Sequence, residues 1–456
     1  RANTTGSNNT ALGQGALITN STASNNTALG YLALRTNTTG TSNVAVGALA
    51  LDACTTGSNN TAGGGNALGA MTTGSHNTAF GKGAGDAITT ASDNTALGSH
   101  SLGSTSTGTN NVAVGREAMF SNTTASNNTA VGYFALKENT TGTSNTAVGA
   151  NALDANTTAN FNDAFGHKAL SANTTGEANS AFGNSALELN STGTSNCAIG
   201  YGALYANTTA DNNTAVGSAS LDANTTGANN TAVGRNSLTA NTTGGSNTAV
   251  GTNALLVQTT GASNTAIGVQ AGQSVTTGNS NVFVGFAAGQ DQITTGQDQC
   301  FIARSNDAGG NATVWLYGGT SGQCIQGNNS SSWTTTSDQR LKKDIVTNTV
   351  GLSIIDNVTV KNFKYKQYSD GSPVTSDDTV DMSEFPDADG VHQVLIGQGK
   401  TELQIGIIAQ ELEAVAPNCV TTNDKGVKTV DTDELFWHML NAIKELSAKV
   451  TALEAG

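Results

Sequence analysis

A short polar segment in the last third of the chain contains residue types that nucleophilic catalysis needs. In S-D-Q-R-L-K-K-D-I, from Ser337 to Ile345, a serine precedes a lysine by five residues. A serine hydroxyl is a poor nucleophile at neutral pH, and a nearby lysine can act as its base where desolvation lowers the lysine pKa. Because such pairs occur by chance in most proteins, Ser337 and Lys342 alone do not predict an active site.

The spacing of this pair requires a particular local structure. Five residues correspond to about 140° around an α-helix, so Ser337 and Lys342 do not share a helical face. A bend in the chain, or a neighbouring subunit, must therefore bring the two side chains together. The alternative is that Lys342 only begins a solvated amphipathic helix and that no reaction takes place.

A 17-residue repeat precedes this segment and makes up most of the chain. A glycine recurs in seventeen copies from Gly13 to Gly285 without insertion or deletion. Every copy has Asn four residues before the glycine and Thr nine residues after it. A strict period of this length indicates units that stack on one another into a solenoid. The Asn and Thr side chains are expected to form hydrogen-bonded ladders along the stack.

The apolar residues of the repeat predict which way each strand faces. The residue before the glycine is bulky and apolar in sixteen copies, with Gly63 as the exception, and the residue before that is Ala in sixteen, with Phe283 as the exception. We therefore expect a short strand of the type T-A-V-G, a bend, a second short element around Ala-Leu, and a return loop N-T-T-G. Alternate strand residues point to opposite faces, so Ala faces one way and the bulky residue the other, with one face packed inside and one packed on another copy of the chain. At the spacing of paired strands, the stack would be about 80 Å long.

Composition and charge limit the possible functions. The net charge is −14 and the repeats contain few Lys or Arg residues, which excludes nucleic acid as a partner. No apolar run is long enough to span a membrane, so no membrane insertion is expected. The cysteines show no spacing typical of a zinc site or a disulfide framework, and no metal or cofactor is expected; they are Cys54, Cys197, Cys300, Cys324 and Cys419.

Changes in composition divide the chain into three parts. Residues 1–290 contain the repeats, residues 291–336 contain a degenerate repeat and a connector with short strands, and residues 337–456 have the composition of an ordinary globular domain. The last part ends in a predicted coiled-coil helix over residues 435–454. Its seam has the 3-4 spacing of a short coiled coil and consists of Phe436, Met439, Ile443, Leu446, Val450 and Leu453. The seam favours a trimer; the alternative is a helix packed on its own domain, and His438 beside the seam is expected at the surface or in the interface.

The repeats resemble the head repeats of trimeric autotransporter adhesins, whose cores have the form N-x-A-[IV]-G. Matching cores run over residues 43–47, 196–200 and 264–268. The resemblance covers residues 1–290 and implies a mainly β fold: a 17-turn, left-handed parallel β-roll or β-solenoid in a bundle of three chains.

The C-terminal part resembles the intramolecular chaperone domain of phage tail spikes and tail fibres, the endosialidase-type self-cleaving family (peptidase S74). The resemblance depends on the segment from Ser337, on I-G-I-I-A-Q-E-L over residues 405–412 and on A-I-K-E-L over residues 442–446. It implies a small α+β domain that trimerises, guides folding of the fibre and then cleaves itself off.

The same resemblance implies the roles of individual residues. Ser337 would be the nucleophile and Lys342 its base, with the scissile bond between Thr336 and Ser337. Asp338 and Arg340 match the family motif and would support the site, whereas Lys343 is a rival base that does not match it. The activity would be at most a single-turnover self-cleavage, with no external substrate.

Two functional classes follow from these features. The first is a homotrimeric phage tail fibre or appendage, exposed on the virion, that contacts other tail proteins at its N-terminal side and a glycan or protein receptor on the host. The second is a bacterial trimeric adhesin with the same chaperone domain. An autotransporter adhesin would end in a membrane-anchoring β-barrel, whereas residues 435–456 are expected to form a soluble helix, and this favours the virus. Ice binding through the Thr ladder is disfavoured because adjacent Thr residues of N-T-T point in opposite directions.

Overall fold

The computed structural model describes residues 3–289, 295–303, 314–318, 324–326, 351–363, 404–422, 428–430 and 432–455. The chain divides into two compact units, Arg1–Ser331 and Ser332–Gly456.

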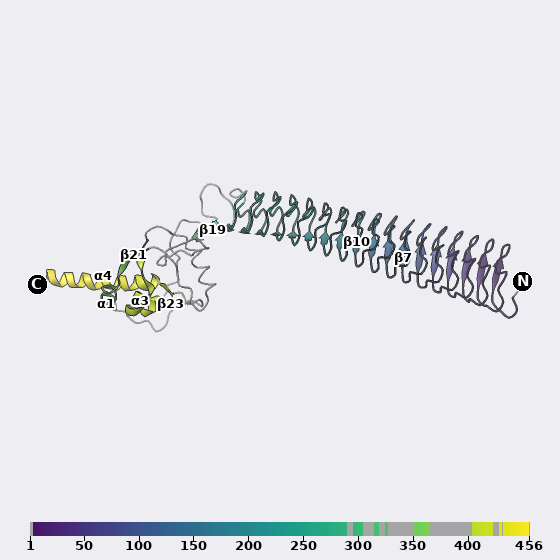
Figure 1. The fold of residues 1–456 in the computed structure, drawn as a ribbon, viewed down its shortest axis with the longest axis horizontal. Coiled ribbons are helices and arrows are strands. Elements are labelled where there is room, and N and C mark those ends of the chain that lie inside the picture. Colours follow the sequence, from purple (N-terminus) through teal and green to yellow (C-terminus); the bar gives the residue numbers. More distant parts are fainter. Residues whose placement is uncertain are drawn as a thin grey trace, which may run out of the picture. The chain divides into compact units, whose positions relative to one another are not determined.

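The first unit is a stack of seventeen similar turns, each with one three-residue strand (Figure 1). Each strand pairs in parallel with the strand of the next turn, so that Thr129 lies beside Thr146 and Val131 beside Val148. The register is 17 residues throughout the repeats, which confirms the predicted parallel β-solenoid. The strands are β1 (Thr10–Leu12), β2 (Thr27–Leu29), β3 (Val44–Val46), β4 (Thr61–Gly63), β5 (Thr78–Phe80), β6 (Thr95–Leu97), β7 (Val112–Val114), β8 (Thr129–Val131), β9 (Thr146–Val148), β10 (Asp163–Phe165), β11 (Ser180–Phe182), β12 (Cys197–Ile199), β13 (Thr214–Val216), β14 (Thr231–Val233), β15 (Thr248–Val250), β16 (Thr265–Ile267) and β17 (Val282–Val284).

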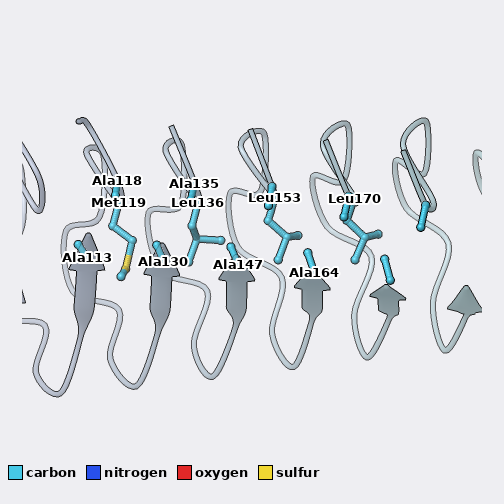
Figure 2. Packing of buried hydrophobic residues seen from close by; sticks show 14 of the residues in the cluster. Ala113, Ala118, Met119, Ala130, Ala135, Leu136, Ala147, Leu153, Ala164 and Leu170 are labelled. Carbon is cyan, nitrogen blue, oxygen red and sulfur yellow. The ribbon is translucent and has the colours of Figure 1, made fainter. Parts of the chain in front are cut away.

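The core of the stack is thin and built mainly from Ala and Leu. Figure 2 shows the strand residues Ala130 and Ala147 facing Leu136 and Leu153 from the opposite side of the turn. All four side chains are fully buried. Of the two strand faces that the sequence predicted, the Ala face is therefore the inner one, and the pair three and four residues after the glycine closes the core.

The second short element of the repeat is a tight turn, not a strand. Leu136 has a positive φ of 52° and its N–H donates to the carbonyl oxygen of Ala152 in the next turn, at 2.9 Å. A left-handed conformation costs a leucine about 1–2 kcal/mol. Full burial of the Leu136 side chain recovers about 1.5–3 kcal/mol, so the conformation is maintained at each turn.

The repeat glycine is required by both the bend and the close stacking of turns. Gly149 has a φ of +138°, and a Cβ added there would overlap the carbonyl oxygen of Gly166 in the next turn. A side chain at this position would therefore strain the backbone and separate neighbouring turns.

A buried Asn ladder links the turns, as the repeat predicted. The Oδ1 atom of Asn145 accepts the N–H of Asn162 at 3.0 Å, and its Nδ2 donates to the carbonyl oxygen of Ala159 at 2.8 Å. These amides supply hydrogen-bond partners to a buried N–H and a buried carbonyl of the return loop, alongside the backbone hydrogen bonds that other loop residues make to neighbouring turns.

A second Asn ladder, which the sequence reasoning missed, follows seven residues after the glycine. It joins Asn139 to Asn156 at 2.9 Å but is interrupted at four turns by Cys54, Met71, Ile88 and Thr105. At its ends, the buried Oδ1 atoms of Asn37 and Asn241 have no hydrogen-bond partner, because Cys54 and Gln258 occupy the next turns.

The hydroxyl ladder lies one residue away from the predicted one. The Oγ1 atom of Thr140 donates to the carbonyl oxygen of Thr157, and Thr157 donates in turn to Thr174. The invariant Thr nine residues after the glycine is exposed in all sixteen described copies, from Thr22 to Thr277. Hydrogen bonds between turns therefore account for the first threonine of N-T-T, whereas they do not explain why the second, exposed threonine is invariant.

Aromatic residues replace Ala where the regular stack ends. Phe283 is fully buried on β17 and stacks on Phe301 of β18 (Cys300–Ala303) with ring centroids 5.9 Å apart. Space for the Phe283 ring exists because Gly272 and Gly289 stand where other turns have Leu. After β18, β19 (Val314–Gly318) and β20 (Cys324–Gln326) pair antiparallel.

The described part of the second unit contains short strands and four helical segments. Strand β21 (Val360–Phe363) pairs antiparallel with β22 (Gln404–Ile407), and β23 (Val420–Thr422) pairs with β24 (Lys428–Val430). The helical segments are α1 (Leu352–Ile355), α3 (Ala409–Val415), the 3₁₀ segment η3 (Pro417–Cys419) and α4 (Thr432–Glu454). The predicted C-terminal helix is thus present and begins three residues earlier than expected.

Candidate functional site

The residues predicted to carry the self-cleavage reaction lie outside the described part of the chain. These residues are Thr336, Ser337, Asp338, Arg340 and Lys342. Their roles stay predictions, and the described residues that bear on function are those that form surfaces for assembly and contact.

Helix α4 has two different apolar faces. Leu435, His438 and Ala442 form one face, and each is at most 7% exposed. Leu435 belongs to a buried cluster with Leu412, Ala416 and Cys419. His438 is thus buried in its own unit, and the expectation of a surface or interface histidine was wrong. The 3-4 spacing of 435, 438 and 442 is the sequence signal that could have identified this face.

The predicted seam residues form the other face of α4. Ile443 is 62% exposed and Leu446 is 54% exposed. The remaining seam residues are also exposed: Phe436, Met439, Val450 and Leu453. Since the helix packs on its own unit through a different face, the seam stays available for another chain.

A groove beside α4 extends this exposed apolar surface. It has a volume of about 260 Å³ and lies between α1 and α4. A Cβ added at Gly351 would overlap the backbone of Ala442, so the two helices approach closely there. The groove is lined by Leu352, Ile355, Asp356, Met439, Ala442, Ile443 and Leu446.

Two ion pairs connect α3 to the strands of the second unit. Lys361 on β21 contacts Glu411 at 2.6 Å, and Lys428 on β24 contacts Glu413 at 2.7 Å. Both pairs are substantially exposed, and exposed pairs contribute about 0–1 kcal/mol. The buried cluster around Leu412, more than these pairs, therefore holds α3 in the second unit.

The repeat stack also has a long exposed apolar surface. The bulky residue before each glycine points away from the core, and none of the sixteen is buried. We call these sixteen residues the outer row. They are Leu12, Leu29, Val46, Phe80, Leu97, Val114, Val131, Val148, Phe165, Phe182, Ile199, Val216, Val233, Val250, Ile267 and Val284. An apolar patch that runs the length of the stack far exceeds what a monomeric protein normally exposes.

The one gap in the outer row is filled by a neighbouring side chain. Gly63 stands where a bulky residue is expected, and the ring of Phe80 from the next turn occupies the space that a Cβ at Gly63 would need. Further along, the rings of Phe165 and Phe182 stack with centroids 4.8 Å apart. The outer row is therefore continuous across the exception noted in the sequence.

A second surface follows the residue directly after each glycine, which we call the post-glycine column. Unlike the outer row it is mixed in character, because it contains Lys82, Arg116 and Arg235 as well as tyrosines. Tyr133 is 44% exposed and Tyr201 is 67% exposed. The sequence reasoning missed this column, although the 34-residue spacing of Tyr133, His167 and Tyr201 was visible.

The post-glycine column has its densest side-chain interactions at two turns. Tyr133 stacks on Phe134 with centroids 3.8 Å apart, and the Arg116 guanidinium lies 5.8 Å from the Tyr133 ring centroid. Lys137 lies 4.9 Å from the Phe134 centroid and pairs with Glu138 at 2.9 Å. The hydrogen bond from Lys137 lowers the pKa of Glu138, so this carboxylate is ionised at neutral pH.

The described residues lack three further kinds of structural feature: a metal site, a membrane-spanning helix and a disulfide bond. No group of three or more His, Cys, Asp or Glu residues there is placed to hold a metal ion. No described helix is both long and apolar enough to cross a lipid bilayer. Four cysteines have side chains that the structure describes, and none of these forms a disulfide: Cys54, Cys197, Cys300 and Cys419.

Taken together, the fold defines a repeat-solenoid protein whose separate C-terminal unit presents an apolar helix face. Residues 337–421 match the family model described as the chaperone of endosialidase, Peptidase_S74. The C-terminal unit is therefore similar to the chaperone domains that the sequence resemblance indicated, and the chain has the features of a fibre or adhesin assembled by such a domain. No curated protein and no solved structure gave a match.

Proposed function

We propose that this chain is a structural fibre protein of a phage virion, assembled as a homotrimer by its C-terminal domain. The observation that carries the proposal is the pair of uncovered apolar surfaces, the outer row on the stack and the seam on α4. Both surfaces are too large and too continuous for a chain that acts alone in water. A tail-fibre location at the particle surface fits a long repeat stack that presents receptor-contacting side chains.

The two surfaces suit a parallel assembly of identical chains. Each is a straight row along its own element, and identical rows from three copies can meet around one axis. The seam of α4 is under three heptads long, so it would need the rest of the domain for stability. Because seventeen similar turns can pair in several registers, a domain that sets the register of three chains removes wrong alignments.

Self-cleavage would follow assembly. The Ser337 hydroxyl, deprotonated by Lys342, would attack the carbonyl carbon of Thr336, so that the acyl group moves from the Ser337 nitrogen to its oxygen and the nitrogen gains a proton. Water would then hydrolyse the ester and release the two chains. Lys342 can act as the base only when folding removes it from water, which would couple cleavage to completed folding.

The oligomeric state of the full chain tests the assembly proposal. Light scattering should give three times the chain mass of 45.7 kDa, or three times the mass of residues 1–336 after cleavage. Ile443→Asp places a charge on the exposed seam and should prevent trimer formation, whereas Lys444→Asp, which changes an exposed neighbour off the seam, should not. A monomeric wild-type chain would refute the proposal.

Denaturing mass spectrometry tests the cleavage step. The wild type should give a product that begins at Ser337, and both Ser337→Ala and Lys342→Ala should abolish it. Lys343→Ala is the matched control and should cleave normally. An intact wild-type chain, or cleavage that depends on Lys343 instead, would refute the proposed pair.

A bacterial trimeric adhesin with the same domain is the second candidate. The outer row and the seam fit this function equally well, since both require three chains. Antibody labelling distinguishes the two: the phage proposal expects the protein on purified virions, and the adhesin proposal expects it on bacteria that carry no phage.

A further inference from the structure

The post-glycine column contains a regular series of exposed planar side chains. Tyr133, His167 and Tyr201 follow the glycines of the turns that contain β8, β10 and β12, and all three are exposed. The intervening turns have Ala150 and Asn184 at the same position. Because the strands stack in register, these five residues form one line along the stack.

The spacing of the planar side chains is set by the stack. Two turns separate neighbouring members, which is about 10 Å at the spacing of paired strands. That distance is close to the length of two sugar units in an extended polysaccharide. Tyr133 is held in place by its stack on Phe134, and Asn184 Nδ2 lies 3.5 Å from His167 Nδ1.

Polar groups flank this line on the neighbouring part of each turn. The carboxylates of Asp154, Glu188 and Asp222 occur five residues after their glycines. Glu188 contacts Lys168 at 3.4 Å, and the Asp222 carboxylate lies 3.4 Å from the position of a Cβ at Gly202, beside Tyr201. Carboxylates and amides next to aromatic faces are the groups that bind sugar hydroxyls in water.

The charge around the line indicates which class of polysaccharide could bind there. The cations Arg116, Lys137 and Lys168 are outnumbered by five carboxylates, which are Glu117, Glu138, Asp154, Glu188 and Asp222. An excess of negative charge repels polyanions such as sulfated or uronic-acid polysaccharides. The charged side chains around the line therefore favour an uncharged polysaccharide.

The line is also distinct from the surface assigned to assembly. The outer row contains no charged residue, whereas the post-glycine column contains Lys82, Arg116 and Arg235, charges that a dry interface between copies would have to remove from water. The column can therefore face solvent when the outer row is covered.

We propose that the segment of the post-glycine column from Tyr133 to Tyr201 binds an extended neutral polysaccharide, with alternate sugar rings on Tyr133, His167 and Tyr201. This inference rests on the proposed receptor-contacting function and specifies its ligand class. Each chain of a trimer contributes one such line, so the assembled fibre carries three.

Titration of the full-length chain with linear hexasaccharides tests the proposal. The neutral probes are cellohexaose, xylohexaose, mannohexaose and chitohexaose, and a heparin hexasaccharide is the anionic probe. At least one neutral probe should bind saturably, and the double variant Tyr133→Ala/Tyr201→Ala should weaken it by about tenfold or more. Tyr31→Ala is the matched control, because Tyr31 is 52% exposed at the same position of a distant turn, and it should leave binding unchanged.

Three results would overturn the inference: no binding of any neutral probe, equal binding by the double variant, or a preference for heparin. Light scattering of the double variant checks that assembly is intact, and Tyr133→Phe/Tyr201→Phe should retain binding if the ring faces make the contact. Adhesion to host cells separates the two proposals. If the double variant adheres as well as the wild type, the fibre function stands and polysaccharide binding by the post-glycine column is refuted. If the wild type adheres to no cell and is absent from virions, the fibre function fails, and the titration still decides whether the column binds polysaccharide.

Discussion

Removal of one ladder amide should open the stack locally. In Asn145→Ala the N–H of Asn162 loses the oxygen that it contacts at 3.0 Å and stays buried without an acceptor. The carbonyl of Ala159 loses the Nδ2 donor at 2.8 Å but keeps the Asn156 amide at 3.2 Å. One buried donor is thus orphaned, and one carbonyl keeps a single partner.

These losses set the expected magnitude. An orphaned buried donor costs about 1–3 kcal/mol and a lost hydrogen bond about 1 kcal/mol, so the local stability should fall by about 2–4 kcal/mol. A loss of this size raises the population of the open state by at least about tenfold. Hydrogen exchange of the Asn162 amide, followed by mass spectrometry of the surrounding peptide, measures this population.

A matched variant of the same copy controls for unrelated effects. Thr158→Ala truncates an exposed side chain thirteen residues further along and should leave exchange at Asn162 unchanged. Unchanged protection of the Asn162 amide in Asn145→Ala would refute the view that the buried Asn ladder, and not only the strand pairing, holds the turns together.

Three further perturbations test other parts of the fold. Gly149→Ala should clearly lower the unfolding temperature, because its Cβ would overlap the backbone of Gly166. Ala150→Ser is the control and should leave the unfolding temperature unchanged, because Ser99 and Ser218 occupy the same position in other copies. Equal unfolding temperatures for the two variants would contradict the close-stacking argument. Phe283→Ala should lower the free energy of unfolding by about 3–5 kcal/mol through the cavity it leaves, and should speed proteolysis near residues 295–303. Phe286→Ala, at an exposed position, should have neither effect. Equal digestion of the two variants would contradict the role of Phe283 as the end of the core. Burial raises the pKa of the Cys54 thiol from 9.0 to about 11, so the unfolded chain loses this proton first and the folded stability should fall as pH rises from 9 to 11. Denaturant unfolding of wild type and Cys54→Ser across this pH range measures the effect, which should be smaller in the variant; identical pH profiles would exclude it.

Much of the stack could be predicted because each turn repeats the same local sequence pattern. The glycine at each bend, and the division of each strand into an Ala face and a bulky face, follow from steric limits and strand alternation, which act within a few residues. The Asn ladder was predictable for the same reason, since an invariant amide at a fixed phase needs a partner one turn away.

Other features depended on which residues meet across turns. The core has room for Phe283 only because Gly272 and Gly289 lie against its ring, and the Phe80 ring fills the gap at Gly63 from the next turn. The threonine that forms the hydroxyl ladder could not be chosen from N-T-T by spacing alone. The self-cleavage residues from Thr336 to Lys342 were identified by resemblance and remain a prediction.

The amino-acid sequence by itself determined that the chain stacks, with what period, and that both strand faces carry apolar residues, because these features depend on backbone geometry and local alternation. Only the tertiary structure decided which apolar surfaces stay uncovered. On α4, Leu435, His438 and Ala442 pack on their own unit and leave Ile443 and Leu446 exposed, although both sets have helical spacing. The physical reason is that a helix shows the same periodicity on any face, and only the residues packed against it determine which face is buried.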